Sequence, residues 1–292
     1  MGEMMPGGMM RGGMMSQMMG GAGMMRGGMG AMMTRMMGFF GRSILVNGHP
    51  DAVLDVAARP CRLRVLNACN ARTCKLAWSD GRPLTVIATD GGLLERPLQK
   101  DFIMLTPGQR IELWADFSGA AVGSERTLRS LAFSGSMMMQ EMMGRMGDGM
   151  MAGAGDWAPL ADGAAFDICR LRVARPAGTA PTTRLPERIA PMPRLRAEDV
   201  VRLGTTEVWE FQNNRMMAHA IHLHGLQFLV LGRSHGPADD VRAGYVDEGW
   251  GDTVLLMPGE RIRMLMQFKD FAGRYAYQCH ILEHAASGLM RA

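Results

Sequence analysis

The sequence lacks an uninterrupted apolar run long enough to cross a membrane. Glycine, arginine or aspartate interrupts every candidate segment, whereas a membrane-spanning helix needs about 18 or more consecutive apolar residues. The N-terminus also lacks a charged start followed by an apolar stretch and a small-residue cleavage site, so we expect no secretory signal in this chain. The sequence therefore predicts a protein without a membrane span.

Lysine is scarce, and the positive charge is dispersed. Only three of the 32 basic residues are lysine, and the formal net charge of +4 is spread along the chain. Proteins that bind nucleic acid usually concentrate their basic residues on one face or in one block. The sequence therefore predicts no nucleic-acid partner.

Cysteine is present in an odd number and without the spacing of a zinc ribbon. The five cysteines include no Cys-x-x-Cys pair, so neither a zinc ribbon nor a complete disulfide framework is indicated. Cys61, Cys69 and Cys74 lie close in sequence, whereas Cys169 is isolated. We interpret them as buried structural thiols.

Aromatic residues are few, but methionine is abundant, with 32 residues in the chain. Residues 1–37 hold 16 of them, interleaved with glycine. So much glycine makes a stable helix too costly in backbone entropy, and we predict a flexible tail over residues 1–40. A second Met-rich segment, 136–151, is predicted to be a long loop. Thioethers favour Cu(I), although low-complexity drift would also explain the tail.

Long amphipathic helices are absent, and short apolar runs alternate with turn residues from about residue 41 onward. Alternation over five to eight residues with Asn-Gly, Asp-Gly and Pro-Gly punctuation indicates antiparallel β-structure. A Pro-rich connector at 174–193 separates two such regions. We therefore predict two β-sandwiches or barrels in tandem, at residues 41–175 and 176–292.

Five of the seven histidines fall in two short windows near the C-terminus. In an extended strand, side chains at even offsets share a face, and those at odd offsets lie on opposite faces. His222 and His224 should therefore point to one side of their strand and His219 to the other. The same parity separates Cys279 from His280, so each strand can serve two sites.

A cysteine thiolate and two imidazoles can form a metal site in this region. In a trigonal arrangement with a weak or absent axial group, they are the ligand set of a blue-copper electron-transfer site. His219, Cys279 and His284 can supply that set if their strands are adjacent. The alternative is that each is an ordinary core residue, but their clustering argues against it because half-satisfied imidazoles are costly in a β-core.

Two motifs make the chain resemble the multicopper oxidases, the family of laccases and bacterial cuprous oxidases. His-x-x-His-x-His-Gly matches residues 219–225, and His-Cys-His-x-x-x-His followed by an axial residue matches residues 278–290 apart from its first histidine. The similarity covers about residues 41–292. It implies an all-β fold of two tandem cupredoxin-like Greek-key β-barrels, with copper as cofactor and a periplasmic location.

The resemblance also implies a role for each of the clustered residues. Type 1 copper would be bound by His219, Cys279 and His284. A trinuclear copper cluster would be faced by His222, His224 and His280.

The chain departs from the family pattern on the trinuclear side. Family members normally carry a first cupredoxin domain with two His-x-His pairs, and no such pair precedes His219 here. Gln278 stands where the second motif has histidine, on the same strand face as His280. A complete set of family sites also uses more histidines than the seven of this chain. We therefore expect an incomplete trinuclear centre and a missing first domain.

The axial position of type 1 copper also departs from the pattern. It falls on Leu289, ten residues after Cys279, and leucine cannot coordinate. Loss of a thioether donor should raise the reduction potential. A slipped loop could present Met290 instead. Arg215 stands where cuprous oxidases of the family tend to carry an acid, so the resemblance does not extend to that position.

A further group of charged residues surrounds Trp250. The acidic residues there are Asp247, Glu248 and Asp252. We interpret them as a solvated acidic loop rather than as a substrate contact.

Three functional hypotheses follow. The first is an oxidase in which type 1 copper takes electrons from a phenol or from Cu(I) and passes them to an oxygen-reducing cluster. The second is a non-catalytic copper-binding or electron-transfer protein. The third is a fragment of a longer laccase-like oxidase, which would need a missing-domain partner.

Overall fold

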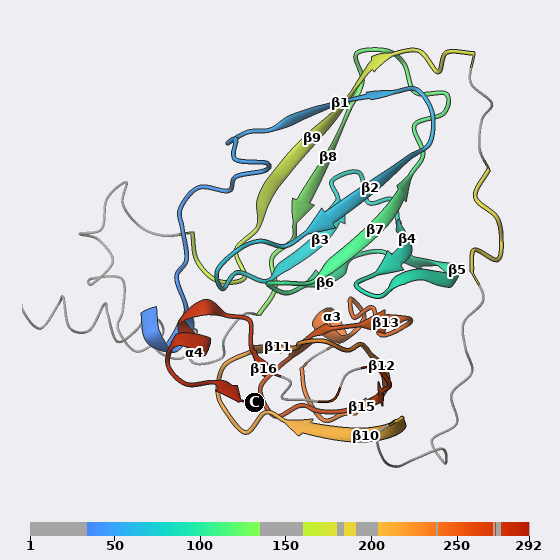
Figure 1. Ribbon diagram of the computed structural model, residues 1–292. Coiled ribbons are helices and arrows are strands. Elements are labelled where there is room, and N and C mark those ends of the chain that lie inside the picture. Colours follow the sequence, from blue (N-terminus) through green and yellow to red (C-terminus); the bar gives the residue numbers. More distant parts are fainter. Residues whose placement is uncertain are drawn as a thin grey trace, which may run out of the picture.

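The computed structural model describes residues 34–134, 160–179, 184–190, 204–237, 239–270, 272 and 276–291. The predicted tail up to residue 33 and the predicted Met-rich loop 136–151 lie outside this part of the chain. Nearly all the regular structure described is β-strand, arranged as two stacked units (Figure 1). The all-β prediction is confirmed. No helix within the described ranges combines the length and apolarity that a membrane crossing requires.

The first unit contains two sheets that enclose one apolar core. One sheet has the strand order β1-β9-β8-β3-β6 and the other β2-β7-β4-β5. All neighbours are antiparallel except β1 and β9, which are parallel. The strands are β1 (Val53–Ala57), β2 (Cys61–Leu66), β3 (Cys74–Trp78), β4 (Leu84–Thr89), β5 (Gly92–Lys100), β6 (Ile103–Leu105), β7 (Arg110–Ala115), β8 (Glu125–Ser130) and β9 (Phe166–Arg175).

The second unit contains two further four-stranded sheets, with the orders β10-β15-β12-β13 and β14-β11-β16-β17. Its strands are β10 (Thr205–Gln212), β11 (His219–Leu223), β12 (Phe228–Ser234), β13 (Trp250–Gly251), β14 (Thr253–Leu256), β15 (Arg261–Phe268), β16 (Tyr277–Cys279) and β17 (Met290–Arg291). Two short helices accompany them, α3 (Asp239–Arg242) and α4 (Leu282–Ala286).

Alternating apolar residues place the core of the first unit. Along β7, Ile111, Leu113 and Ala115 are buried, while the residues between them are half-exposed. This alternation follows from the period-two geometry of a strand. Burying each large aliphatic side chain stabilises the fold by about 1.5–3 kcal/mol, so the pattern holds β7 in register.

The two units make direct backbone contacts. The amide of Gly91 donates to the carbonyl of Trp250 at 2.7 Å, and the amide of Met104 donates to the carbonyl of Gly244 at 2.8 Å. A Cβ atom on Gly91 would collide with Trp250, so this close approach requires glycine. The turn between β4 and β5 is thereby fixed against the strand that carries Trp250.

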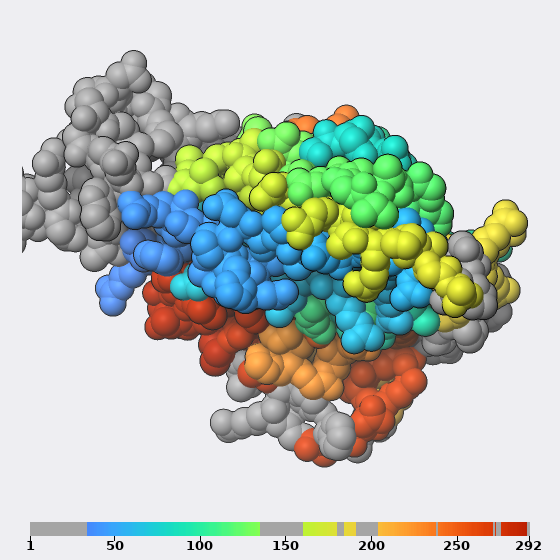
Figure 2. Space-filling model, turned by 90° about the horizontal axis from the view of Figure 1, so that it is seen from above, coloured from blue at the N-terminus to red at the C-terminus, as the bar shows by residue number. Residues whose placement is uncertain are grey.

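Residues 34–40 pack onto the folded units although the sequence assigned them to the tail. Residues 34–37 form one helical turn, and Met37 is buried. Gly38, with φ +88°, approaches Ala71 so closely that a Cβ atom would clash. This segment, in blue, lies against the red C-terminal region in Figure 2.

Candidate metal centre

β11 carries histidines on both of its faces. The strand lies between β14 and β16 in its sheet. The ring centroids of His219 and His284 are 5.0 Å apart, and those of His222 and His224 are 4.7 Å apart. His219 thus faces one group of residues and His222 another, which is the parity predicted from the sequence.

The ligand atoms of His219, Cys279 and His284 converge. They lie within 4.8 Å of one another, and Sγ of Cys279 is 3.4 Å from Nδ1 of His284. Cys279 ends β16, and His284 returns to it because α4 turns the chain back immediately after the strand. Cys279 and His284 are buried, and His219 is half-buried. The structure therefore brings together the three residues expected to bind type 1 copper.

The protonation states of these side chains suit a metal ion. Burial, together with the nearby charges of His284 and Arg215, lowers the pKa of His219 to about 4, so its imidazole is neutral at pH 7. Burial raises the pKa of the Cys279 thiol. A thiolate at this position therefore needs a cation beside it, and a metal ion that displaces the thiol proton supplies one.

The tautomer of His284 is fixed by a backbone contact. Its Nε2 lies 2.7 Å from the carbonyl oxygen of Met36. A carbonyl can only accept, so Nε2 carries the hydrogen, and Nδ1 turns its lone pair toward Cys279. One thiolate and two neutral imidazoles are a donor set that fits copper, and an outer hydrogen bond of this kind orients metal-binding histidines.

Leu289 rather than Met290 lies beside this centre. Leu289 lines the same pocket as His219 and Cys279. The amide of Cys279 also donates to the carbonyl of Leu289 at 3.0 Å. Met290 stands opposite Gln278 in the β16–β17 register, with half of its surface exposed. This arrangement favours leucine at the predicted axial position.

His222, His224 and His280 gather on the other face. The ring centroids of His222 and His280 are 5.3 Å apart. Nδ1 of His222 lies 3.0 Å from the carbonyl oxygen of Asp252, so Nδ1 carries the hydrogen and the lone pair of Nε2 is available to a metal ion. Within the described part of the chain, only the trio of His219, Cys279 and His284 brings three ligand atoms as close as 4.8 Å.

Gln278 occupies this second face as expected. It pairs directly with His222 across β11 and β16. Its Oε1 is buried without a hydrogen-bond partner among the described residues. An amide oxygen is a weaker ligand for copper than an imidazole.

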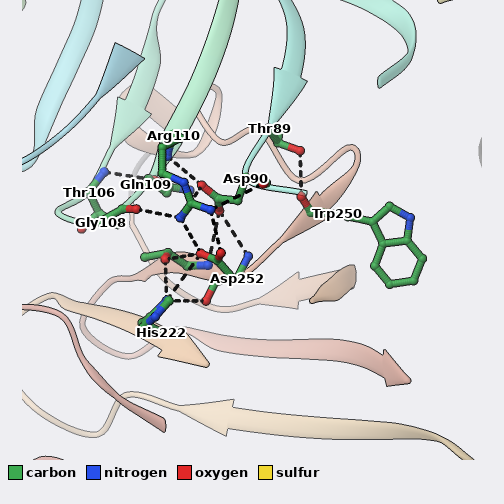
Figure 3. A network of polar contacts seen from close by, with 10 residues as sticks. Thr89, Asp90, Thr106, Gly108, Gln109, Arg110, His222, Trp250 and Asp252 are labelled. Atoms are coloured by element: carbon green, nitrogen blue, oxygen red, sulfur yellow. Dashed lines mark hydrogen bonds and ion pairs between the residues drawn. The ribbon is translucent and has the colours of Figure 1, made fainter. Parts of the chain in front are cut away.

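A network of charged side chains supports His222 from the first unit (Figure 3). The guanidinium of Arg110 donates two hydrogen bonds to the carboxylate of Asp252, at 2.8 and 2.7 Å. Asp90 accepts from the backbone amides of Arg110, Asp252 and Thr253 at 2.7, 3.2 and 3.3 Å. The network therefore links the first unit, through Arg110 and Asp90, to Asp252, whose backbone carbonyl accepts a hydrogen bond from His222.

The pKa values of the two carboxyl groups in this network are shifted in opposite directions. Burial and the neighbouring charge of Asp252 raise the pKa of Asp90 to about 6. Burial alone would raise the pKa of Asp252, but hydrogen bonds from His222, Arg110 and Thr253 outweigh it and hold that pKa well below its ordinary value. Asp252 is thus the ionised anchor of the network.

The interpretation of a solvated acidic loop around Trp250 is wrong for two of its residues. Asp252 bonds Arg110, and Asp247 bonds Arg233 at 2.8 Å. Both arginines come from other strands, so their pairing could not be seen in the local sequence. Asp90 lies in a Thr-Asp-Gly-Gly segment, and its partners Arg110, Asp252 and Thr253 likewise come from other parts of the chain.

Three methionines from separate segments lie near His219. Met37, Met217 and Met257 line one pocket with this histidine. Because these three positions are far apart in the chain, no local pattern marks them as a group. The pocket beside the expected type 1 ligand is therefore lined by thioether side chains, which are soft donors.

Comparison with known proteins identifies the family. The family model described as multicopper oxidase matches residues 178–292. A laccase of Bacillus subtilis is 29% identical over 302 residues, which covers 87% of this chain and 54% of the relative. A laccase of Haloferax volcanii is 32% identical over 273 residues, which covers 86% of this chain and 47% of the relative.

Solved structures agree with these matches. The McoA multicopper oxidase of Aquifex aeolicus has a TM-score of 0.70 at 28% identity, which covers 87% of this chain and 59% of that one. The chain belongs to the multicopper oxidase family. It spans about half the length of the curated relatives it matches. A further relative, 33% identical over 262 residues (75% of this chain, 49% of the relative), is the cell division protein FtsP of Edwardsiella tarda.

Proposed function

We propose that this chain is a copper-binding oxidoreductase whose type 1 copper accepts electrons from a small reductant. The observation that carries the proposal is the convergence of His219, Cys279 and His284 within 4.8 Å. Copper bound there would exchange one electron between Cu(II) and Cu(I). The chain supplies one cysteine sulfur, two imidazoles and the Met36 carbonyl that orients His284.

The geometry also supports a path from this centre to the opposite face. Cys279 and His280 are adjacent in sequence, and the ring of His280 lies near that of His222. A single peptide unit therefore connects the proposed type 1 site to the second group of histidines. In this arrangement the chain's own residues link electron entry to the expected trinuclear side.

Cu(I) is favoured over a phenol as the reductant. Met37, Met217 and Met257 share a pocket with His219, and thioether sulfur selects Cu(I). Arg215 stands near His219, where its charge contributes to lowering that histidine's pKa. We therefore propose that Cu(I) approaches His219 through the pocket lined by Met37, Met217 and Met257.

Among the described residues, the second face lacks a full set of histidines for oxygen reduction by this chain alone. The second face offers His222, His224 and His280, together with an amide at Gln278 instead of an imidazole. We therefore propose that the trinuclear centre is incomplete in this chain and that a partner domain would have to add the remaining histidines. A periplasmic location is likewise proposed by resemblance.

A non-catalytic copper-binding or electron-transfer role is the second candidate. The incomplete second face favours it, since an electron that reaches this face has no complete oxygen-reducing cluster to receive it. One relative of this chain is named as a cell division protein and not as an oxidase. A fragment of a longer oxidase fits the same observations.

Copper loading and oxygen uptake test the proposal together. The protein loaded with Cu(II) should show intense blue thiolate-to-copper absorption, bind Cu(II) tightly at one site and consume little oxygen. Cys279→Ser should remove the absorption, whereas Cys169→Ser, which replaces a buried thiol of the first unit, should leave it unchanged. A loaded protein without blue absorption would refute the type 1 assignment. Sustained four-electron oxygen reduction would refute the incomplete centre.

A further inference from the structure

Two cysteines outside the proposed copper centre face each other. Cys69 and Cys74 lie in and after the connection between β2 and β3, and both are free. Their thiols are hydrogen-bond partners of one another. Cys74 is buried, whereas Cys69 is half-buried and therefore reachable from solvent.

The backbone around this pair is held by one buried asparagine. The side-chain amide of Asn67 donates to the carbonyls of Arg72 and Leu105, both at 2.8 Å. Its side-chain oxygen accepts the amide of Cys69 at 3.0 Å. These hydrogen bonds fix the backbone conformation of the connection between β2 and β3 and therefore the positions of the two cysteines.

A fixed positive charge lies beside the pair. The guanidinium of Arg72 donates to the carbonyls of Leu160, Ala161 and Gly41 at 2.6, 3.0 and 3.1 Å. It also stacks near the ring of Phe40, and the residue is 3% exposed. Held in this way, the charge favours an anion at the neighbouring sulfur atoms.

The two thiols divide their protons unequally. The hydrogen bond from Cys74 lowers the pKa of Cys69 to about 7, with burial opposing and Arg72 assisting. The hydrogen bond with Cys69 and burial raise the pKa of Cys74 well above its ordinary value. The pair therefore gives up its first proton more readily than an ordinary thiol and its second proton less readily.

We propose that Cys69 and Cys74 form a two-coordinate site for a soft monovalent cation. The bound ion is Cu(I), and the two sulfur atoms are its ligands. Thiolates select such ions. The ion replaces the shared proton: Cu⁺ and the pair S⁻···H–S give S–Cu–S⁻ and one released H⁺. The net charge stays at −1, which the guanidinium of Arg72 already balances. No oxidant or reductant takes part.

The site lies beside the proposed type 1 centre. Ala71, between the two cysteines, packs in one cluster with Cys279 and Ile281. The amide of Leu282, the first residue of α4, donates to the carbonyl of Asn70 at 3.3 Å. The turn between β2 and β3 therefore lies next to the helix that carries His284, and α4 and this part of the first unit are neighbours in Figure 1.

Competitive Cu(I) titration of the 292-residue chain tests this proposal. The protein is prepared without oxygen, and bathocuproine disulfonate sets a free Cu(I) level that bis-thiolate sites fill and thioether sites do not. We expect Cys69→Ser and Cys74→Ser each to bind one Cu(I) fewer per chain than the unchanged protein. Cys61→Ser is the matched control, because Cys61 is equally half-buried, and it should lose none.

Two further readouts keep the result independent of folding and of the type 1 site. Blue absorption after separate Cu(II) loading should persist in Cys69→Ser, which shows that the variant is folded. Bound Cu(I) should also protect Cys69 from alkylation. Equal Cu(I) uptake by the unchanged protein and Cys69→Ser would overturn the proposal, as would a Cys69–Cys74 disulfide in the anaerobic preparation. Failure of blue absorption in every protein would instead count against the proposed function alone.

Discussion

The imidazole of His284 donates a hydrogen bond to the backbone carbonyl of Met36, 2.7 Å away, across 248 residues of chain. This contact joins the helical turn at residues 34–37 to one of the three residues of the proposed copper centre. Because the carbonyl accepts at Nε2, the other ring nitrogen is left for the metal. The N-terminal region therefore helps to set the ligand geometry.

Deletion of residues 1–37 should weaken copper binding at the proposed type 1 site by about 10- to 100-fold, since loss of an outer hydrogen bond to a ligand histidine has effects of this size. Deletion of residues 1–33 keeps Met36 and should leave the affinity unchanged. Chelator competition, followed by the blue absorption, measures both. If the two deletions behave alike, the Met36 contact does not position His284.

The axial position can be tested by a pair of exchanges. Leu289→Met should lower the reduction potential of the bound copper, because it introduces a thioether donor beside Cys279. Met290→Leu should leave the potential unchanged, since Met290 lies outward in β17. Redox titration of the blue absorption distinguishes the two. A potential that moves only with Met290→Leu would mean that the chain is shifted by one residue at this end.

Strand parity explains how much of the site could be predicted. Period-two geometry alone separates His219 from His222, and Cys279 from His280, and the structure has both separations. The resemblance then supplied the chemistry of the converging trio. Both separations depend only on the spacing of residues within one strand, so they can be predicted from the local sequence.

The supporting contacts could not be predicted because their partners are distant in sequence. Arg110 and Asp252 are 142 residues apart, and their pairing depends on how the two units dock. The Met36 carbonyl has no side-chain signature at all, since any residue could supply it. Docking and backbone geometry, rather than residue type, decide such contacts.

Gly108→Ala should destabilise the protein and displace His280. Gly108 has φ +86°, and a Cβ atom there would lie 2.9 Å from two carbon atoms of the His280 ring. Alanine at positive φ costs about 1 kcal/mol, and the collision should add about 1–3 kcal/mol. The measurement is the free energy of unfolding in urea.

Gly119→Ala provides the matched control for this prediction. Its φ is +75°, but nothing lies within 4 Å of the added Cβ atom, so only the backbone cost should appear. The difference between the two variants therefore measures the contact with His280. If both variants lose the same free energy of unfolding, the His280 ring moves away from the added Cβ atom at no measurable cost.

Asp252→Asn should destabilise the metal-free protein by about 1–3 kcal/mol at neutral pH, because it removes the carboxylate that bonds Arg110. Asp55→Asn, which removes a surface partner of Arg172, should cost less than about 0.5 kcal/mol. Urea unfolding across a pH series compares the three proteins. A loss at Asp252 no larger than that at Asp55 would contradict the anchoring role.

The pH dependence of this difference follows from the lowered pKa of Asp252. A carboxyl group with a depressed pKa in the folded state stabilises the fold above its ordinary value of 3.8, and the contribution is lost as the pH falls below that value. The stability gap between the unchanged protein and Asp252→Asn should therefore narrow in acid. Asp90, with its pKa raised to about 6, acts in the opposite direction, since the fold loses stability as the pH rises from about 4 to 6 and Asp90 ionises. Asp252→Asn removes a negative charge beside Asp90 and should make that second loss smaller. Below about pH 4 Asp90 no longer contributes, so a gap that stays constant as the pH falls from about 4 to about 2 would show that Asp252 is not held ionised by its partners.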